Sequence, residues 1–132
     1  MNKDIIQTIN KLENLKFIGP VLLNDINRAE KELNIKFAED YIQYVKKFGA
    51  ISANGLELTG ITKHERLSVV SVTQNEKKLN FNMPDNMYVI ENVGINGILI
   101  LQDSNGAVYS FIKNRNPIKI ANSLAEYIES VM

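Results

Sequence analysis

The sequence predicts an α+β fold, a single domain over residues 1–132 with N-terminal helices packed on a mainly antiparallel sheet meander and a closing C-terminal helix. Apolar residues recur at helical spacing up to about residue 48, then at strand spacing, then at helical spacing again near the end. Short connections rich in glycine and asparagine join the later segments, which favours antiparallel pairing. Hydrophobic residues make up 45% of the chain and charged residues 23%, as in globular rather than disordered proteins.

Two helices are predicted in the first 34 residues. The first covers residues 3–15, because Ile5, Ile9 and Leu12 lie on one stripe. The Gly-Pro pair at residues 19–20 breaks the chain after it. Asn24, a good N-cap type, is expected to start the second helix, and Asn34 to end it.

A third helix is predicted over residues 38–48. Its first turn carries Glu39 and Asp40 and its last turn two lysines, so both ends complement the helix dipole. Tyr44 is expected at the rim of the core, and Gly49 in the left-handed region just past the helix. The residues expected to face the core are Tyr41, Ile42, Val45 and Phe48.

The second half of the chain reads mainly as short strands. Residues 55–60 alternate between apolar and polar and predict a half-buried strand. Residues 69–79 are ambiguous, since three valines favour a strand, but a short helix starting near Ser68 is the preferred interpretation. Strands are then predicted at residues 87–91, 97–102 (central), 107–111 and 118–120 (edge), separated by turns at 84–86, 96–97, 103–106 and 116–117. A last helix starts near Asn122 or Ser123, and one face of the sheet is expected to stay partly free.

Five segments from Asn24 onward form a recognisable series: residues 30–35 (EKELNI), 37–41 (FAEDY), 47–49 (KFG), 68–73 (SVVSVT) and 123–127 (SLAEY). Their order resembles the SUKH superfamily, which groups bacterial toxin-immunity proteins with fungal cell-wall regulators. Ala38 stands where the family commonly has proline, a mild departure because proline there mainly sets the first helical turn.

Charge and composition indicate which cellular compartment and which classes of partner to expect. Fifteen basic and fifteen acidic residues give no net charge, so no basic footprint for nucleic acid is expected. Asp4 and Gln7 interrupt what would be the apolar core of a signal peptide, and no run is long enough to span a bilayer. The chain has no cysteine, which is compatible with a reducing compartment. We expect a soluble, cytoplasmic protein without a membrane partner.

No motif of catalysis appears in the sequence. The single histidine, His64, lies in a polar connection and is expected to be a surface residue. Phosphate-loop, dinucleotide and nucleophile-elbow patterns are absent, and the turn at Asp103 lacks the acidic closing ligand of a calcium loop. The five tyrosines are expected mainly in the core. The sequence therefore predicts neither an enzyme nor a cofactor or metal site.

The resemblance implies an immunity protein that binds and neutralises a cognate protein toxin in competition between bacteria, by stoichiometric contact without turnover. The alternative is a regulatory or scaffold module of the same superfamily. Recognition usually uses exposed loop residues on a rigid scaffold. The predicted partner-binding residues are Asn54, Glu57, Glu65, Arg66 and Asp85.

Overall fold

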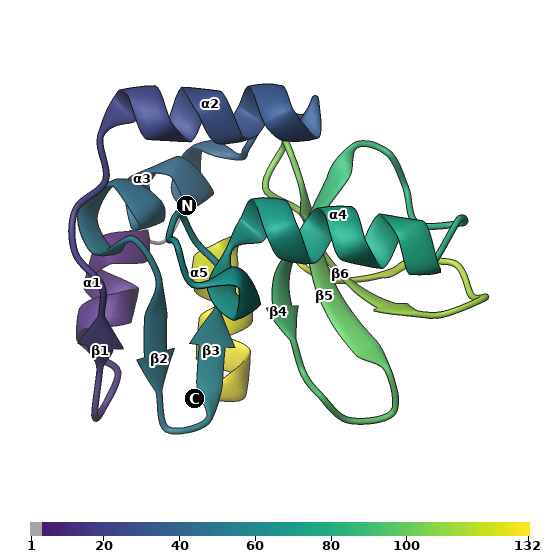
Figure 1. Ribbon diagram of the computed structural model, residues 1–132. Coiled ribbons are helices and arrows are strands. Elements are labelled where there is room, and N and C mark those ends of the chain that lie inside the picture. Colours follow the sequence, from purple (N-terminus) through teal and green to yellow (C-terminus); the bar gives the residue numbers. More distant parts are fainter. Residues whose placement is uncertain (1–3) are drawn as a thin grey trace.

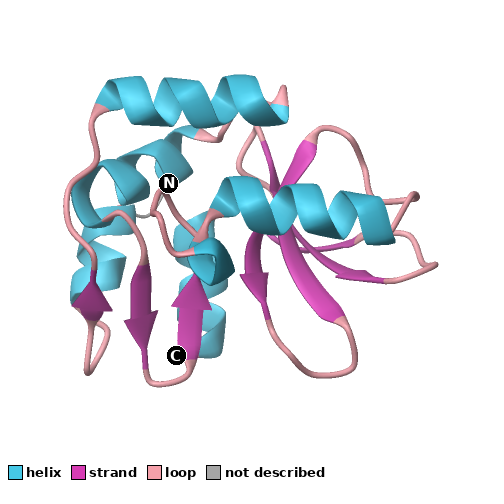
Figure 2. Ribbon diagram, viewed as in Figure 1, coloured by secondary structure: helices cyan, strands magenta, loops and turns pink. Residues whose placement is uncertain are grey.

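The computed structural model describes residues 4–132 and confirms the α+β class (Figures 1 and 2). Position 3 of the first predicted helix lies outside the described residues. The helices are α1 (Ile5–Asn10), α2 (Leu23–Leu33), α3 (Glu39–Phe48), the 3-10 turn η1 (Glu65–Leu67), α4 (Val69–Leu79) and α5 (Leu124–Val131).

The strands form two antiparallel sheets rather than the one predicted meander. The first sheet has the order β1 (Lys16–Phe17), β2 (Ile51–Ala53), β3 (Leu56–Leu58). The second has the order β4 (Met87–Asn92), β5 (Ile98–Asp103), β6 (Val108–Ile112), β7 (Ile118–Ala121). The sheets meet where the amide of Thr59, just after β3, donates to the carbonyl of Ile90 in β4 at 2.9 Å.

The first predicted helix was too long. Asp4 caps α1, because its side chain accepts hydrogen bonds from the amides of Ile6 and Gln7. The helix ends at Asn10, and Asn14 takes a positive φ of 58°, which a continuing helix does not allow. The chain then pairs with β2 as the unpredicted strand β1.

The next two helices are close to the prediction, with two differences. Asn24 is not the N-cap of α2: Leu22 holds that position in extended backbone, because the amide of Val21 is already fixed to the carbonyl of Lys46. Tyr44 is fully buried rather than at the rim, and its hydroxyl donates to the carbonyl of Thr59 at 2.8 Å. Asn34 ends α2 in the left-handed region as predicted.

Gly49 has the positive φ that was predicted, but not the left-handed helical conformation. With φ 75° and ψ −70° it forms a γ-turn, in which the amide of Ala50 donates to the carbonyl of Phe48 at 2.9 Å. The backbone of Gly60 packs directly on this turn. A Cβ atom on Gly60 would lie 1.7 Å from the Gly49 carbonyl oxygen, and one on Gly49 would lie 2.6 Å from that of Gly19.

The later elements follow the prediction closely. Ser68 caps α4 by accepting from the amide of Ser71, which decides the ambiguous segment in favour of a helix. The Asn96-Gly97 pair has positive φ at both residues, as a tight hairpin turn requires. β5 is central and β7 is an edge. Ser123 caps α5 by accepting from the amide of Glu126. The strand predicted at 55–60 is shorter, because Asn54-Gly55 forms the β2–β3 turn.

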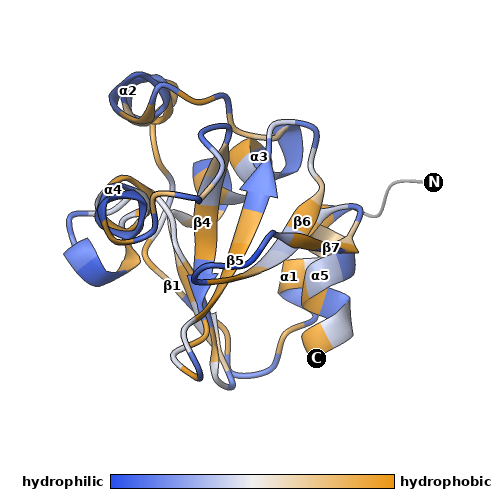
Figure 3. Ribbon diagram, turned by 90° about the vertical axis from the view of Figure 1, so that its right-hand side faces the viewer, coloured by the Kyte–Doolittle hydropathy of each residue, from blue (hydrophilic) through white to orange (hydrophobic). Residues whose placement is uncertain are grey.

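Helices lie against both faces of the second sheet, although Ile118 and Ile120 of β7 remain exposed. Figure 3 shows its strands between α4 on one side and α1 and α5 on the other. Tyr88, Ile90 and Ile100 belong to the larger core shared with α3 and α5. Val89 and Leu101 point the other way, into a smaller core that includes Val72 of α4. Alternate residues of β4 and β5 are therefore apolar on both sides.

A buried polar chain connects α3, the second sheet and α5. The amide of Ala38 donates to the hydroxyl of Tyr88, which donates to Gln102 Oε1 at 2.7 Å. Gln102 Nε2 donates to Asp40 Oδ1 at 3.0 Å, and Asp40 Oδ2 accepts from the amide of Leu124 at 2.8 Å. Burial raises the pKa of Asp40, and the hydrogen bonds from Leu124 and Gln102 oppose that rise. One carboxylate thus fixes the start of α5 against α3.

Candidate functional site

The structure brings some of the five predicted partner-binding residues together and separates others. Arg66 of η1 donates two hydrogen bonds to the Glu57 carboxylate of β3, from Nη1 to Oε1 at 2.5 Å and from Nη2 to Oε2 at 3.0 Å. Glu65 is exposed next to Arg66. Asn54 is at the β2–β3 turn, where its Oδ1 accepts from Asn14. Asp85 lies beyond the other end of α4, and its carbonyl accepts from Lys77. These positions remain a prediction of partner contact.

Sequence reasoning missed an apolar groove of about 910 Å³ beside α5. Its floor is the sheet face formed by β5, β6 and β7, and α5 forms one wall. The other walls are the β2–β3 turn, the loop between β4 and β5, and the segment after α1. The residues that line it are Lys11–Glu13, Ala53–Leu56, Glu91, Val93, Ile95, Ile98, Ile100, Ser110, Ile120, Tyr127 and Ser130–Met132.

The rim of the groove is apolar and exposed. Ile95 is 62% exposed, Val131 50% and Ile120 44%, although each is a residue that normally packs inside. They come from three separate elements and gather around one depression, which distinguishes them from scattered surface leucines and isoleucines. Of the five predicted residues, only Asn54 lines this groove. The signal in the sequence was the apolar residue pair Val93 and Ile95 inside a loop.

A buried carboxylate lies at the base of the groove. Glu91 is 7% exposed, and its side chain accepts hydrogen bonds from the Tyr127 hydroxyl and from the Glu57 amide. Burial raises the pKa of Glu91, and the hydrogen bond from Tyr127 partly opposes that rise. Burial also raises the pKa of Tyr127, and the neighbouring Glu91 adds to it. The pair therefore keeps the Tyr127 proton in place.

A β-bulge explains how Glu91 comes to face the groove. Val89 pairs with Leu101 and Glu91 pairs with Ile100, so Ile90 is the extra residue in β4. In a regular strand without the bulge, Ile90 would pair with Ile100, and alternation would turn Glu91 to the side of Val89, towards α4. The inserted residue shifts the register and places Glu91 on the face of Ile100.

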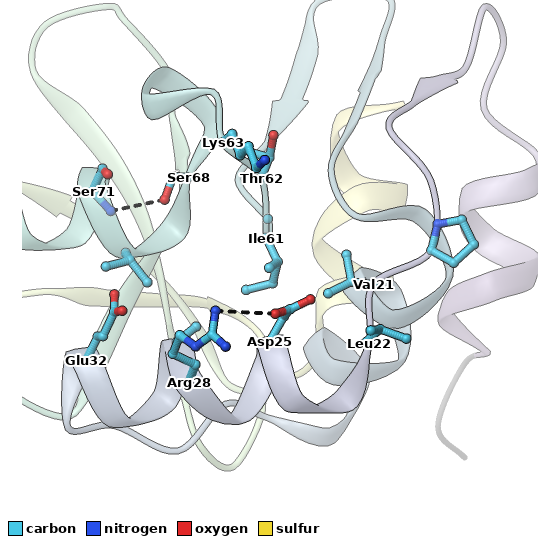
Figure 4. A pocket seen from close by; sticks show the side chains of 14 residues that line it. Val21, Leu22, Asp25, Arg28, Glu32, Ile61, Thr62, Lys63, Ser68 and Ser71 are labelled. Atoms are coloured by element: carbon cyan, nitrogen blue, oxygen red, sulfur yellow. Dashed lines mark hydrogen bonds and ion pairs between the residues drawn. The ribbon is translucent and has the colours of Figure 1, made fainter.

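A second hollow, of about 470 Å³, lies between α2 and α4 and has a mixed polar and apolar lining (Figure 4). Arg28 and Asp25 of α2 form an ion pair across one turn at 3.6 Å, with side chains 70% and 42% exposed. On the opposite side, at the start of α4, the amide of Ser71 donates to Ser68 Oγ at 3.2 Å. The charged side chains of this hollow lie in water, where they add little binding energy.

Within residues 4–132 no group of three or more histidine, aspartate or glutamate side chains is arranged to hold a metal ion. His64 is exposed, and its amide donates to Thr62 Oγ1 at 3.2 Å. No helix in this part of the chain is long and apolar enough to cross a membrane.

The SUKH_5 family model, described as SMI1-KNR4 cell-wall, matches residues 2–132, nearly the whole chain. A search of curated proteins finds no match.

Proposed function

The chain belongs to the SMI1-KNR4 family, and from this premise we propose that it is an immunity protein, which binds and neutralises a cognate protein toxin by stoichiometric contact in the cytoplasm. The family includes immunity proteins and suggests protein partners in general. In this proposal the protein masks its partner without turnover and is not an enzyme.

The observation that carries the proposal is the exposed apolar rim of the groove beside α5. A surface that leaves Ile95, Ile120 and Val131 in water has an unfavourable hydration free energy until something covers them. Apolar centres with a polar surround are typical of protein interfaces. The balanced formal charge favours neither nucleic acid nor an anionic membrane as the partner.

The test starts with capture of the partner from the producing cells, using purified protein and mass spectrometry. The captured protein is then produced alone and together with the wild type in a neutral host. We expect growth arrest that the wild type relieves. The double variant Ile95→Glu, Val131→Glu should fail to relieve it, because two charges would lie in the apolar contact.

Phe81→Glu is the matched control, since Phe81 is 91% exposed but lies outside the groove. It should protect like the wild type. Equal protection by the groove variant would remove the groove from the interface. A captured protein that causes no growth arrest would favour the regulatory alternative.

The same binding assay examines the surface predicted from the sequence. Glu57→Lys reverses the charge of a partly exposed side chain and Glu65→Lys that of an exposed one, and because surface ion pairs stabilise little, the melting temperature should hardly change. Weaker binding would extend the interface from the groove to η1, whereas unchanged affinity in both variants would exclude these loops. His64→Ala should keep full protection, because the proposed mechanism needs no histidine.

A further inference from the structure

The base of the groove holds a negative charge without a positive one beside it. Among residues 4–132, no lysine or arginine forms an ion pair with Glu91; its partners are one hydroxyl and one amide. A carboxylate can accept about four hydrogen bonds, so with one bond on each oxygen, both oxygens can still accept another. A buried charge without a counter-charge is unfavourable, which makes this group ready to accept a cation.

The charges around Glu91 favour binding of a cation that enters the groove from solvent or from a partner. Lys11 and Glu13 lie exposed at the rim, one of each sign, and balance each other. Glu57 approaches Glu91 from β3, but its own side chain is held by Arg66. Burial is the main cause of the raised pKa of Glu91, and repulsion by the Glu57 charge contributes to it, so the field at the base of the groove is negative.

The walls above Glu91 set the shape of the group that can reach it. Val93 in the wall and Ile98 and Ile100 in the floor give the groove an apolar lining around Glu91, and Tyr127 donates a hydrogen bond to the carboxylate. Lysine and arginine side chains suit such a path, because their methylene stems pack on apolar walls while the charged end reaches an acceptor. A tyrosine ring also attracts a cation placed over its face.

We propose that the groove recognises a segment of the protein partner in which a lysine or arginine, flanked by apolar residues, inserts to pair with Glu91. This inference rests on the proposed function, since it names the chemistry of the partner segment at the same groove. The flanking apolar residues cover Ile95 and Val131 at the rim, and the inserted cation neutralises the base.

A random peptide library displayed on phage tests this without knowledge of the partner. Wild type, Glu91→Gln, Glu39→Gln and the rim variant Ile95→Glu, Val131→Glu are each panned after thermal denaturation confirms that they fold. We expect peptides enriched on the wild type to share a basic residue between apolar ones. Glu39→Gln, an exposed acid outside the groove, should keep that preference, Glu91→Gln should lose the basic residue, and the rim variant should enrich neither.

A second measurement needs no protein variant. An enriched peptide is synthesised with its arginine, or with an arginine in place of its lysine, and again with uncharged citrulline of the same shape. Binding of the citrulline peptide to the wild type should be weaker by roughly tenfold or more, as for other buried charge pairs. Equal affinity would overturn the pairing with Glu91.

The outcomes separate the two proposals. Groove-dependent peptides without a basic residue would overturn the inference and leave the groove as a protein interface. A wild type that enriches no groove-dependent peptide would count against both. A dimer by light scattering that the rim variant abolishes would make the occupant a second copy of this chain, which also overturns the inference.

Discussion

At the scale of single residues, Glu91 shows how one insertion changes the role of a side chain. Sequence alternation places it as the last residue of a strand, with nothing to distinguish it from other exposed glutamates. The bulge at Ile90 instead directs it into a buried position against Tyr127. Its protonation is therefore coupled to folding, because burial raises its pKa in the folded protein.

This coupling gives a pH dependence with a definite sign. The folded state holds the Glu91 proton more tightly than the unfolded chain does, so the stabilisation is complete at low pH and is lost as pH rises through the folded pKa. The free energy of unfolding of the wild type, minus that of Glu91→Gln, should increase as pH falls from neutral. Urea denaturation of both proteins across the acidic range measures it.

Tyr127→Phe provides the control for that prediction. The hydrogen bond from Tyr127 lowers the pKa of Glu91, so its removal should extend the pH dependence to higher pH. A difference between wild type and Glu91→Gln that stays constant over the whole range would contradict the coupling.

Close backbone contact at Gly49 and Gly60 gives a second prediction. Gly49→Ala and Gly60→Ala should each lower the free energy of unfolding by about 2–4 kcal/mol, through strain and a clash with backbone. Gly94→Ala is the matched control for Gly49, because Gly94 has a φ of 77° and open space where a Cβ would be. It should lower the free energy of unfolding by only about 1 kcal/mol. Chemical denaturation compares them; similar losses in all three would mean that the contact contributes nothing.

At the scale of elements, α5 depends on a residue of α3. From the sequence, Glu39 and Asp40 have the same predicted role, as acids that favour the positive end of the helix dipole. The structure separates them, because Glu39 is exposed while Asp40 accepts hydrogen bonds from Leu124 and Gln102. The distinction depends on contacts between residues more than sixty positions apart, which local patterns do not contain.

Asp40→Ala should therefore lower the free energy of unfolding by about 1–3 kcal/mol, because it leaves a buried amide without its acceptor. Hydrogen exchange should accelerate at the first amides of α5, starting at Leu124. Glu39→Ala removes a charge from the same turn and should leave α5 protected. If both variants leave exchange in α5 unchanged, Asp40 does not hold this helix.

At the scale of the whole molecule, the elements that the sequence predicts correctly are those with a local cause. The caps Ser68 and Ser123, the terminator Asn34 and the Asn96-Gly97 turn act within a few residues, and each is confirmed. The strands β1 and β2 have two and three residues, too few to establish a period. They exist because they pair with each other and with β3.

The groove could not be predicted from the sequence, because it too depends on contacts between distant segments. Its walls come from segments that are distant along the chain, and its charged base depends on a register shift that only strand pairing creates. Asn54 was placed correctly beside a turn, yet its position on the groove follows from how the first sheet lies against α5.

Floor and rim residues of the groove differ in how much they contribute to folding, and this has an evolutionary consequence. Floor residues such as Ile100 also pack in the shared core, so selection for folding restricts them. Val93 and Ile95, in contrast, lie in an exposed loop and belong to neither core. If the groove is the proposed interface, mutations there change what it accepts at little cost in stability. A lineage could therefore follow a diverging partner by substitutions in one loop while the scaffold stays constant.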